Sequence, residues 1–253
     1  MWDSPRQLNL LALAFAVVAL GLMAWGAVAW AVRQPAFALR HVVIDGALHR
    51  ADPAHLEAVV REELRGTFFT LRLPETRLSL QKVPWVKAVA LRRQWPDTLR
   101  ITVVEHQPLA RWTEGALIDA EGEVFTADFD GTLPQLAGPE GTAGLVAARY
   151  LDYGAALSQR AVEIAELRLS PRGGWRLRTT GSVPLTIEVG RNEPAERLSR
   201  FIAYYARTIG ALARAGTRVD YVDLRYRNGF AVRIPGFTEK PARKAGQGTV
   251  KAW

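Results

Sequence analysis

Cysteine is absent from this chain of 253 residues, and only four histidines are present. Without cysteine the protein can form neither a disulfide nor a thiolate metal or redox site, so cysteine usage says nothing about its compartment. The histidines form no HxxxH or HExxH pair, which leaves a metal site with weak support. We therefore expect no metal and no cofactor.

Sequence motifs of catalysis are absent as well. Neither a GxSxG nucleophile elbow nor a GxxxxGK[ST] phosphate loop occurs. The carboxylates Asp119, Glu121 and Glu123 fall in a turn sequence, where acidic side chains usually face water. We expect the protein not to be an enzyme. An unrecognised pair of carboxylates for glycan hydrolysis stays open as an alternative, because such pairs form in space rather than in sequence.

Positive charge exceeds negative charge in this chain, with a formal net charge of +8 and a pI of about 10.2. The arginines are scattered and no recognised nucleic-acid module is present, so we expect no nucleic-acid partner. Residues 236–253 are basic and rich in Gly, Pro and Ala. Such a segment cannot bury enough apolar surface to fold and is expected to be a disordered tail. Contact with anionic lipid or wall polymer and the absence of any partner both stay open for it.

One long hydrophobic run is present, from Leu8 to Val32, and it contains no charged residue. About 20 apolar helical residues cross a bilayer core, so we expect a transmembrane helix at residues 8–32 after a stub of residues 1–7. Trp25 and Trp30 lie near its end, where amphipathic rings favour the membrane interface. A cleaved signal peptide is the alternative, because residues 27–29 resemble a cleavage site, although signal h-regions are shorter.

The charges that flank the hydrophobic run do not settle its orientation. Arg6 opposes Asp3 on the short side, and Arg33 and Arg40 follow on the long side. A large domain after a first span can translocate whatever the charges of its loops. We expect a short cytoplasmic N-terminus and the bulk of the chain on the other side of the membrane.

Residues 33–108 have the pattern of a small domain. An extended run at 37–46 is followed by a helix that Asp52-Pro53 opens and by a second helix at 74–82. Two alternating runs, 86–95 and 98–105, flank a turn at Pro96-Asp97 and predict an antiparallel hairpin. The order β-α-α-β-β places two helices on one face of a three-stranded sheet. Trp85 and Trp95 are expected to pack in this domain.

The pattern of residues 109–235 predicts a second domain, which is a mixed β-sheet with packed helices. A helix at 143–157 carries Leu145 and Leu151 on one side, and the proline-rich segment 133–142 before it is expected to be irregular. Three strands, a long helix and a closing hairpin follow. They are expected at residues 163–169, 174–179 and 185–189, at 193–214, and at 218–225 with 229–234.

Two segments of the chain are characteristic. Residues 84–112 read PWVKAVALRRQWPDTLRITVVEHQPLARW, and residues 133–142 read LPQLAGPEGT. The first resembles the POTRA domain and exit segment of the FtsQ/DivIB family of bacterial cell-division proteins, and the second resembles another segment of that family. POTRA domains also occur in outer-membrane assembly proteins, which lack a single N-terminal anchor before one POTRA unit. The resemblance implies an α+β fold with a transmembrane helix, a POTRA domain (33–108) and an FtsQ-type β domain (109–235).

The resemblance also implies a function. Members of the family are non-enzymatic scaffolds of the division machinery, anchored in the inner membrane at the septum with their C-terminal domains in the periplasm. Their anchor and POTRA region serve localisation and earlier partners, notably FtsK. An edge strand of the β domain captures a segment of FtsB, in a complex that also contains FtsL, by strand addition.

Six residues of this chain match the partner-binding positions of the family. Carried over by position, they are Arg191, Arg225, Tyr226, Asn228, Gly229 and Phe230. A guanidinium can meet a carboxylate bidentately, so Arg191 implies pairing with acids of the partner. Phe230 is aromatic where family members often have a small residue. Taken singly, each residue also has a structural explanation, as a turn residue or a solvated arginine.

Two other functions stay open at this point. A POTRA-type periplasmic chaperone or assembly factor would pass on extended substrates by the same strand addition. A wall-active enzyme would use carboxylates that no motif reveals.

Overall fold

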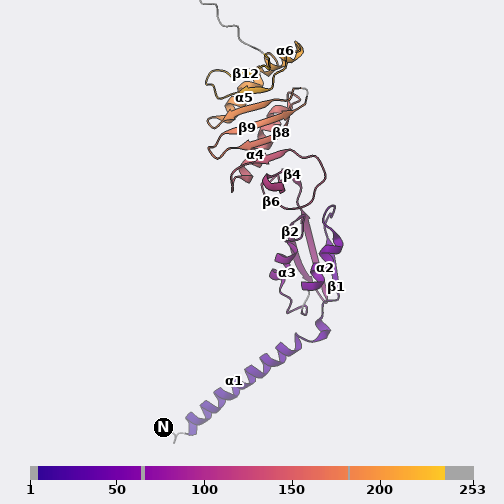
Figure 1. Ribbon diagram of the computed structural model, residues 1–253. Helices are drawn as coiled ribbons and strands as arrows, with labels where there is room; N and C mark the ends of the chain where they lie inside the picture. Colours follow the sequence, from indigo (N-terminus) through magenta and orange to yellow (C-terminus); the bar gives the residue numbers. More distant parts are fainter. Residues whose placement is uncertain (1–4, 64–65, 182, 237–253) are drawn as a thin grey trace, which may run out of the picture. The chain divides into compact units, whose positions relative to one another are not determined.

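The computed structural model describes residues 5–63, 66–181 and 183–236, and their contacts divide the chain into two compact units (Figure 1). Unit 1 comprises Met1–Gln107 with Phe125–Ala127, and unit 2 comprises the remainder. The expected stub lies partly, and the expected disordered tail almost wholly, outside the described residues.

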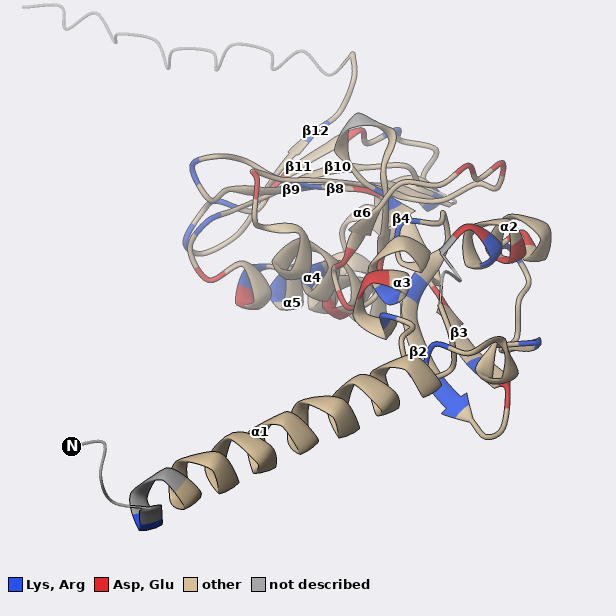
Figure 2. Cartoon of the chain, turned by 90° about the horizontal axis from the view of Figure 1, so that it is seen from below, with Lys and Arg blue, Asp and Glu red and all other residues tan. Residues whose placement is uncertain are grey.

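Helix α1 (Pro5–Ala31) is continuous and begins three residues before the expected position. Figure 2 shows Lys or Arg only near its N-terminal end, and the rest of the helix carries no charge. Among the described residues it is the only helix long and apolar enough to cross a membrane, over Asn9–Ala31. The sequence and the structure are thus consistent with a single-pass membrane anchor.

The sheet of unit 1 has three strands in the order β1-β3-β2. The strands are β1 (His41–Asp45), β2 (Val86–Gln94) and β3 (Thr98–Glu105), and the helices are α2 (Pro53–Glu63) and α3 (Leu73–Leu80). β3 pairs antiparallel with β2 and parallel with β1. The buried side of β3 and one face of each helix form the core, which includes Leu99, Ile101, Leu56, Val60 and Leu80. The expected β-α-α-β-β order is confirmed.

Two expectations for unit 1 are wrong in detail. The first strand begins at His41, because the short 3-10 helix η1 (Pro35–Phe37) occupies the start of the expected run. Proline at the first helical position favours this turn. Trp85 is buried, as expected, but 76% of the Trp95 surface is exposed in the turn between β2 and β3.

Glu105, the last residue of β3, holds the loop that precedes α2. Its buried carboxylate accepts backbone hydrogen bonds from His49 (3.0 Å), Arg50 (3.1 Å) and Ala51 (2.8 Å). Burial acts to raise the pKa of Glu105, but the three hydrogen bonds outweigh it, and the pKa lies below its ordinary value. An ionised carboxylate thus joins the sheet to the entrance of α2.

The sheet of unit 2 contains strands in the order β12-β11-β10-β9-β8-β7-β4-β5-β6. Its strands are β4 (Pro108–Arg111), β5 (Leu117–Asp119), β6 (Val124–Phe125), β7 (Gln135–Ala137), β8 (Glu163–Leu169), β9 (Trp175–Thr180), β10 (Thr186–Gly190), β11 (Tyr221–Asp223) and β12 (Ala231–Arg233). β8, β9 and β10 are antiparallel neighbours, and β11 is parallel to β10. The sheet is therefore mixed, as expected.

Helices cover one face of this sheet. α4 (Ala143–Ser158) and α5 (Pro194–Tyr205) lie on the same side of β8 and β9 in Figure 2. Leu167, Leu177, Ile187 and Phe201 are fully buried in the core. The side chains that alternate with them form charged pairs on the other face. These pairs are Arg168 and Arg178 with Glu166, and Arg176 with Glu188.

The expected long helix at 193–214 is interrupted. α5 ends at Tyr205, and the short helix α6 (Ile209–Arg214) follows. The Thr208 hydroxyl donates to the Tyr204 carbonyl at 2.9 Å, and Thr208 has non-helical backbone angles. Threonine that bonds back to a preceding carbonyl bends helices, a local competition that apolar periodicity does not reveal.

Two further expectations in unit 2 are wrong. The expected irregular segment contains β7, whose Leu136 is fully buried and pairs with Leu167 of β8. On α4 the buried face contains Val146, Ala147, Tyr153 and Leu157, whereas Leu145 and Leu151 are exposed. The apolar residues of α4 surround much of the helix, so composition alone did not select the packed side.

We predict that Glu105→Gln loosens the loop at residues 49–51. The amide oxygen of glutamine is neutral, whereas a hydrogen bond to a charged group contributes about 1.5–3 kcal/mol and a typical neutral one about 1 kcal/mol. Amide hydrogen exchange at Ala51, measured on the full chain in detergent at pH 7, should accelerate roughly ten- to hundredfold. The stabilisation is fully present above about pH 4.3, the ordinary value for Glu, and is lost as the pH falls through the lower pKa of folded Glu105.

Glu57→Gln serves as the control, because Glu57 is an exposed residue of α2. It should leave exchange at residues 49–51 unchanged. If the amide of Ala51 in Glu105→Gln exchanged at the wild-type rate at pH 7, the anchoring role of the carboxylate would be contradicted.

Candidate functional site

Strand β12 lies at one end of the sheet of unit 2. It pairs antiparallel with β11, with Val232 opposite Val222, and no described strand pairs with its other side. A terminal strand keeps a row of backbone N–H and C=O groups without a sheet partner. Val232 is half-buried against the core, while Ala231 and Arg233 are exposed. The strand thus offers an open backbone edge.

An ion pair holds β12 against the start of β11. Arg233 donates from Nε to Asp220 Oδ1 at 3.0 Å and from its Nη2 to Oδ2 at 3.1 Å. Its guanidinium also lies 5.3 Å from the ring centre of Tyr221. The hydrogen bond from Arg233 lowers the pKa of Asp220. Arg233 therefore fixes the position of the short edge strand.

Arg225 is held by the end of β11. Its Nε and Nη2 donate to the Asp223 carboxylate at 2.9 Å and 2.7 Å, and its backbone N–H donates to the same group at 3.0 Å. The hydrogen bond from the Arg225 side chain is the main reason that the pKa of Asp223 lies below its ordinary value. Asp223 is buried and Arg225 is exposed. The guanidinium is thus fixed in place at the surface.

Arg191 directly follows Gly190, a residue that lies against the Arg225 side chain although the two segments are distant in sequence. β10 and β11 are parallel neighbours, and the two arginines follow their carboxyl ends. Gly190, with φ of +81°, lies against the Arg225 side chain, and an added Cβ there would lie 3.0 Å from Arg225 Cγ. Arg191 is exposed and forms no side-chain ion pair within the described part of the chain. Its guanidinium is available to a carboxylate of another molecule.

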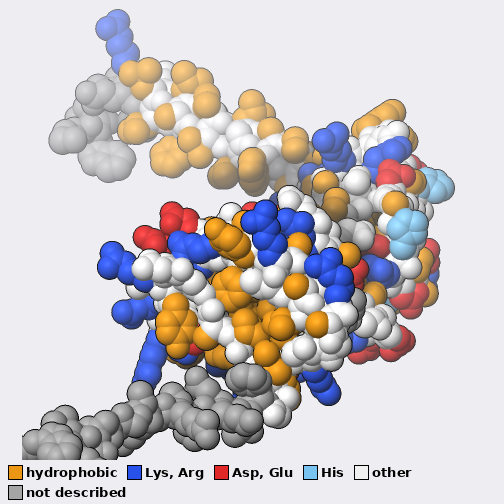
Figure 3. All heavy atoms as spheres, turned by 90° about the horizontal axis from the view of Figure 1, so that it is seen from above, with side chains coloured by type: hydrophobic (Ala, Val, Ile, Leu, Met, Phe, Trp, Pro, Cys, Tyr) orange, Lys and Arg blue, Asp and Glu red, His pale blue; other side chains and the backbone are white. Residues whose placement is uncertain are grey.

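A groove of about 720 Å³ adjoins the edge strand. One wall comes from α5, α6 and the turn between them, and the other comes from the segment that leads into β12. The lining residues are Arg200, Tyr204, Arg207, Thr208, Ala211, Leu212, Asn228, Gly229, Phe230 and Val232. Figure 3 looks onto the end of unit 2 that carries α6 and β12, and shows hydrophobic side chains gathered among Lys and Arg.

The structure places the expected contact residues in three settings. Asn228, Gly229 and Phe230 line the groove. Arg225 and Arg191 lie at the ends of neighbouring strands. Tyr226 protrudes from the connecting loop with 58% of its surface exposed.

Phe230 and Gly229 differ in their structural roles. The Phe230 ring packs edge-on against fully buried Phe201, with centroids 5.4 Å apart. Phe230 thus belongs partly to the core, and its substitution would disturb the fold. A Cβ on Gly229 would meet no atom within 4 Å, and its φ is outside the left-handed region. The expected turn role of Gly229 therefore does not require glycine.

Sequence reasoning missed the helical side of the groove. Arg200 Nη1 donates to the carbonyl of Arg227 at 2.7 Å and ties α5 to the loop before β12. Tyr204 is 51% exposed although it adjoins the buried Tyr205. In the sequence, Tyr204 is a large aromatic residue outside the apolar stripe of the helix, and this position could have indicated the groove.

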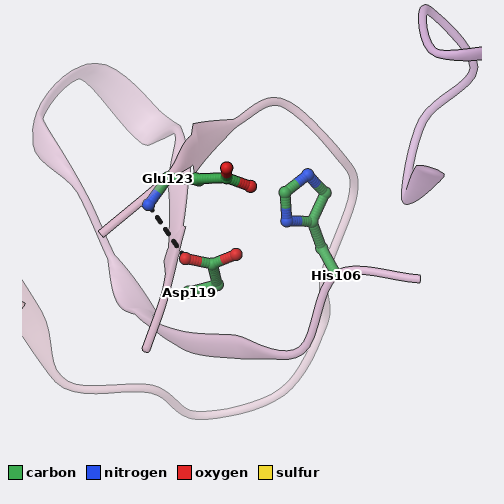
Figure 4. Close-up of side chains that lie close together, drawn as sticks. All are labelled: His106, Asp119 and Glu123. Atoms are coloured by element: carbon green, nitrogen blue, oxygen red, sulfur yellow. Dashed lines mark hydrogen bonds between the residues drawn. The ribbon is translucent and has the colours of Figure 1, made fainter. Parts of the chain in front are cut away.

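Asp119 is not a water-facing turn residue, contrary to expectation. It is buried, and its Oδ1 accepts backbone hydrogen bonds from Glu121 (3.1 Å) and Glu123 (2.9 Å), the second of which is drawn in Figure 4. A short acidic side chain that receives nearby N–H groups closes a turn. Asp119 thus has a structural role in the β5–β6 turn.

Comparisons with known proteins cover both units. The family model described as cell division protein FtsQ/DivIB, C-terminal, matches residues 110–225, and the model described as POTRA domain, FtsQ-type, matches residues 37–106. The first match ends at Arg225, before the loop and strand β12.

Whole proteins are also similar to this chain. Cell division protein FtsQ of Burkholderia pseudomallei is 36% identical over 243 residues, which are 93% of this chain and 95% of that protein. The protein of the same name from Bordetella pertussis is 34% identical over 92% of this chain and 93% of its own length. That of Escherichia coli is 34% identical over 82% and 77%, respectively. The chain therefore belongs to the FtsQ family of bacterial cell-division proteins.

Proposed function

We propose that this protein is a non-enzymatic scaffold of the division machinery that captures FtsB, in a complex with FtsL, by strand addition at β12. Its single membrane helix lies in the inner membrane at the septum, with a short cytoplasmic N-terminus and both units in the periplasm. The anchor and the POTRA domain (33–108) serve localisation and contact with FtsK, and the β domain (109–235) captures FtsB and FtsL.

The observation that carries this proposal is the position of β12 at the end of its sheet. An extended segment of a partner can hydrogen-bond to the open row of backbone groups, and the flanking side chains then select the sequence. The groove beside β12 accepts apolar side chains of the same segment. A strand of three residues needs such support, because its backbone groups alone provide few hydrogen bonds.

Charge around the edge favours an acidic partner. Arg191 and Arg225 follow the carboxyl ends of the neighbouring strands β10 and β11. Arg200 and Arg207 border the groove. Complementary charge accelerates association and disfavours wrong partners. Arg225 is already oriented by Asp223, so it loses little side-chain freedom when it meets a further carboxylate.

The alternative function is that of a POTRA-type periplasmic chaperone or assembly factor, which would bind extended substrates. Both functions use the same edge, but a scaffold forms a specific one-to-one complex, whereas an assembly factor accepts unrelated extended peptides. Competition by an unrelated extended peptide for the FtsB site would favour the assembly factor.

We predict that Tyr226→Ala weakens FtsB binding and leaves the fold intact. Exposed aromatic residues are frequent binding hot spots, and a loss of about 2 kcal/mol corresponds to roughly 30-fold weaker affinity. The melting temperature should be unchanged, because Tyr226 is exposed. Affinity is measured by titration of the full chain in detergent with FtsB.

Leu151→Ala is the matched control, since Leu151 is 44% exposed on α4, away from the edge. It should bind FtsB as the wild type does. Wild-type affinity of Tyr226→Ala would contradict the assignment of this loop.

We predict that Gly229→Leu blocks partner capture sterically. An added Cβ at this position meets no atom within 4 Å in the free protein, so thermal stability should be retained. It would project where the partner approaches the entrance of β12, and affinity for FtsB should fall roughly tenfold or more. The same titration measures it.

Gly154→Leu provides the comparison, because Gly154 on α4 also has open space at its Cβ position. Equal affinities of the two variants would remove the support for binding at β12.

The proposed topology predicts periplasmic activity of a reporter fused after Trp253. A reporter enzyme that folds only in the periplasm should be active there, because one membrane span separates the two ends of the chain. A reporter that is active only in the cytoplasm should be inactive at this position. The opposite pattern would overturn the orientation.

A further inference from the structure

We propose that the end of unit 1 beside α1 is a lipid-contacting surface that lies in the interface of the same bilayer. The surface is formed by three exposed aromatic side chains and two arginines: Trp30, Phe69, Trp95, Arg33 and Arg40. This inference rests on the proposal that α1 is a membrane anchor.

Hydrogen bonds hold the loop of Phe69 at the end of α1. The Thr67 hydroxyl donates to the carbonyl of Val32, the residue after α1, at 2.6 Å. Thr67 also forms an isolated β-bridge with Ala38, and the Phe68 N–H donates to the Phe37 carbonyl at 2.7 Å. The loop therefore lies where the helix leaves the membrane.

The Phe69 ring remains largely outside the core. It lies edge-on to the rings of Phe37 and Phe68, with centroids 5.2 Å and 5.3 Å away, yet 48% of its surface is exposed. The neighbouring Phe68 is buried. One aromatic of the pair thus fixes the loop, while the other faces outward.

Trp95 lies at the same end of the sheet. The Asp97 carbonyl in its turn accepts hydrogen bonds from the backbone N–H groups of Arg40 (3.0 Å) and His41 (3.3 Å). β1 is parallel to β3, and His41 pairs with Thr98, so the β2–β3 turn adjoins the point where the chain enters unit 1 from α1. Trp95 is 76% exposed in that turn. The packing role expected for it from the sequence is therefore replaced by an exposed position near the membrane.

The chemistry of this surface matches a membrane interface. Single exposed hydrophobic residues are common on proteins, but here exposed Trp and Phe adjoin the end of an apolar helix. Amphipathic aromatic rings favour the headgroup region. Residues 31–44 contain no acidic residue, and Arg33 and Arg40 are exposed without an ion pair in the described part of the chain. Basic residues near an anionic lipid surface are attracted to it.

Such contacts would fix the orientation of unit 1 relative to the bilayer. A domain joined to a helix only by a flexible linker could tumble, whereas contacts through two separate turns restrain it. The restraint would set which sides of unit 1 remain open to other proteins.

The experiment uses the absence of cysteine in the natural chain. A nitroxide is attached to Gln94→Cys, an exposed position beside Trp95, in the full chain in vesicles of phosphatidylethanolamine and phosphatidylglycerol. Accessibility to oxygen and to a nickel chelate reports depth. We expect an interfacial depth for residue 94. Leu20→Cys on α1 should report hydrocarbon, and Leu145→Cys in unit 2 should report water.

A second substitution in the Gln94→Cys background tests the aromatic contact. Trp95→Glu should move the label into water, and Trp95→Phe should keep it at the interface. Val104→Glu is the matched control, because Val104 is 52% exposed at the opposite end of β3. It should leave the label at the interface.

The outcomes separate the two proposals. A water-exposed label at residue 20 would overturn the membrane anchor itself. A hydrocarbon signal at residue 20 with a water signal at residue 94 would overturn the lipid-contacting surface alone. An interfacial label that Trp95→Glu does not move would also overturn it.

Discussion

Backbone hydrogen bonding across the sheet of unit 2 is the constraint on which the proposed function depends. The strands from β11 to β5 have a neighbour on each side, whereas β12 pairs only with β11 among the strands that the structure describes. Buried backbone groups need partners, but groups at an exposed edge are satisfied by water and can exchange it for another chain. In the proposed function, the short length of β12 limits unspecific pairing and the neighbouring groove selects the side chains of the partner. Edge and groove therefore form one surface.

Charge is arranged around that edge in two ways. Asp223 and Asp220 fix Arg225 and Arg233, and these ion pairs stabilise the geometry of the last two strands. Arg191 has no such pair among the described residues, so it contributes unbalanced positive charge. Exposed ion pairs contribute little to stability. Their more important effect here is to hold donors in defined positions.

In unit 1 the same principle of satisfied backbone groups acts through side chains. Glu105 satisfies three N–H groups of the loop before α2, and Thr67 satisfies a carbonyl just beyond α1. These contacts join segments that lie 54 and 35 residues apart in sequence. The Thr67 contact gives the POTRA domain a defined connection to α1, on which the proposed contact with lipid depends.

The sequence by itself determined the apolar helix, the β-α-α-β-β order and most strands of unit 2, because these follow from local hydrophobic periodicity and turn residues. Family motifs located the residues around β12. Tertiary structure decided the rest: that Thr208 interrupts the last long helix, that α4 packs through Val146 and Tyr153 rather than Leu145, and that Trp95 is exposed. It also placed Gly190, the residue before Arg191, against the Arg225 side chain and brought α5 and α6 beside the edge strand. The break at Thr208 is a local competition for the Tyr204 carbonyl that apolar periodicity does not reveal. The other features depend on contacts between distant segments, which no local pattern encodes.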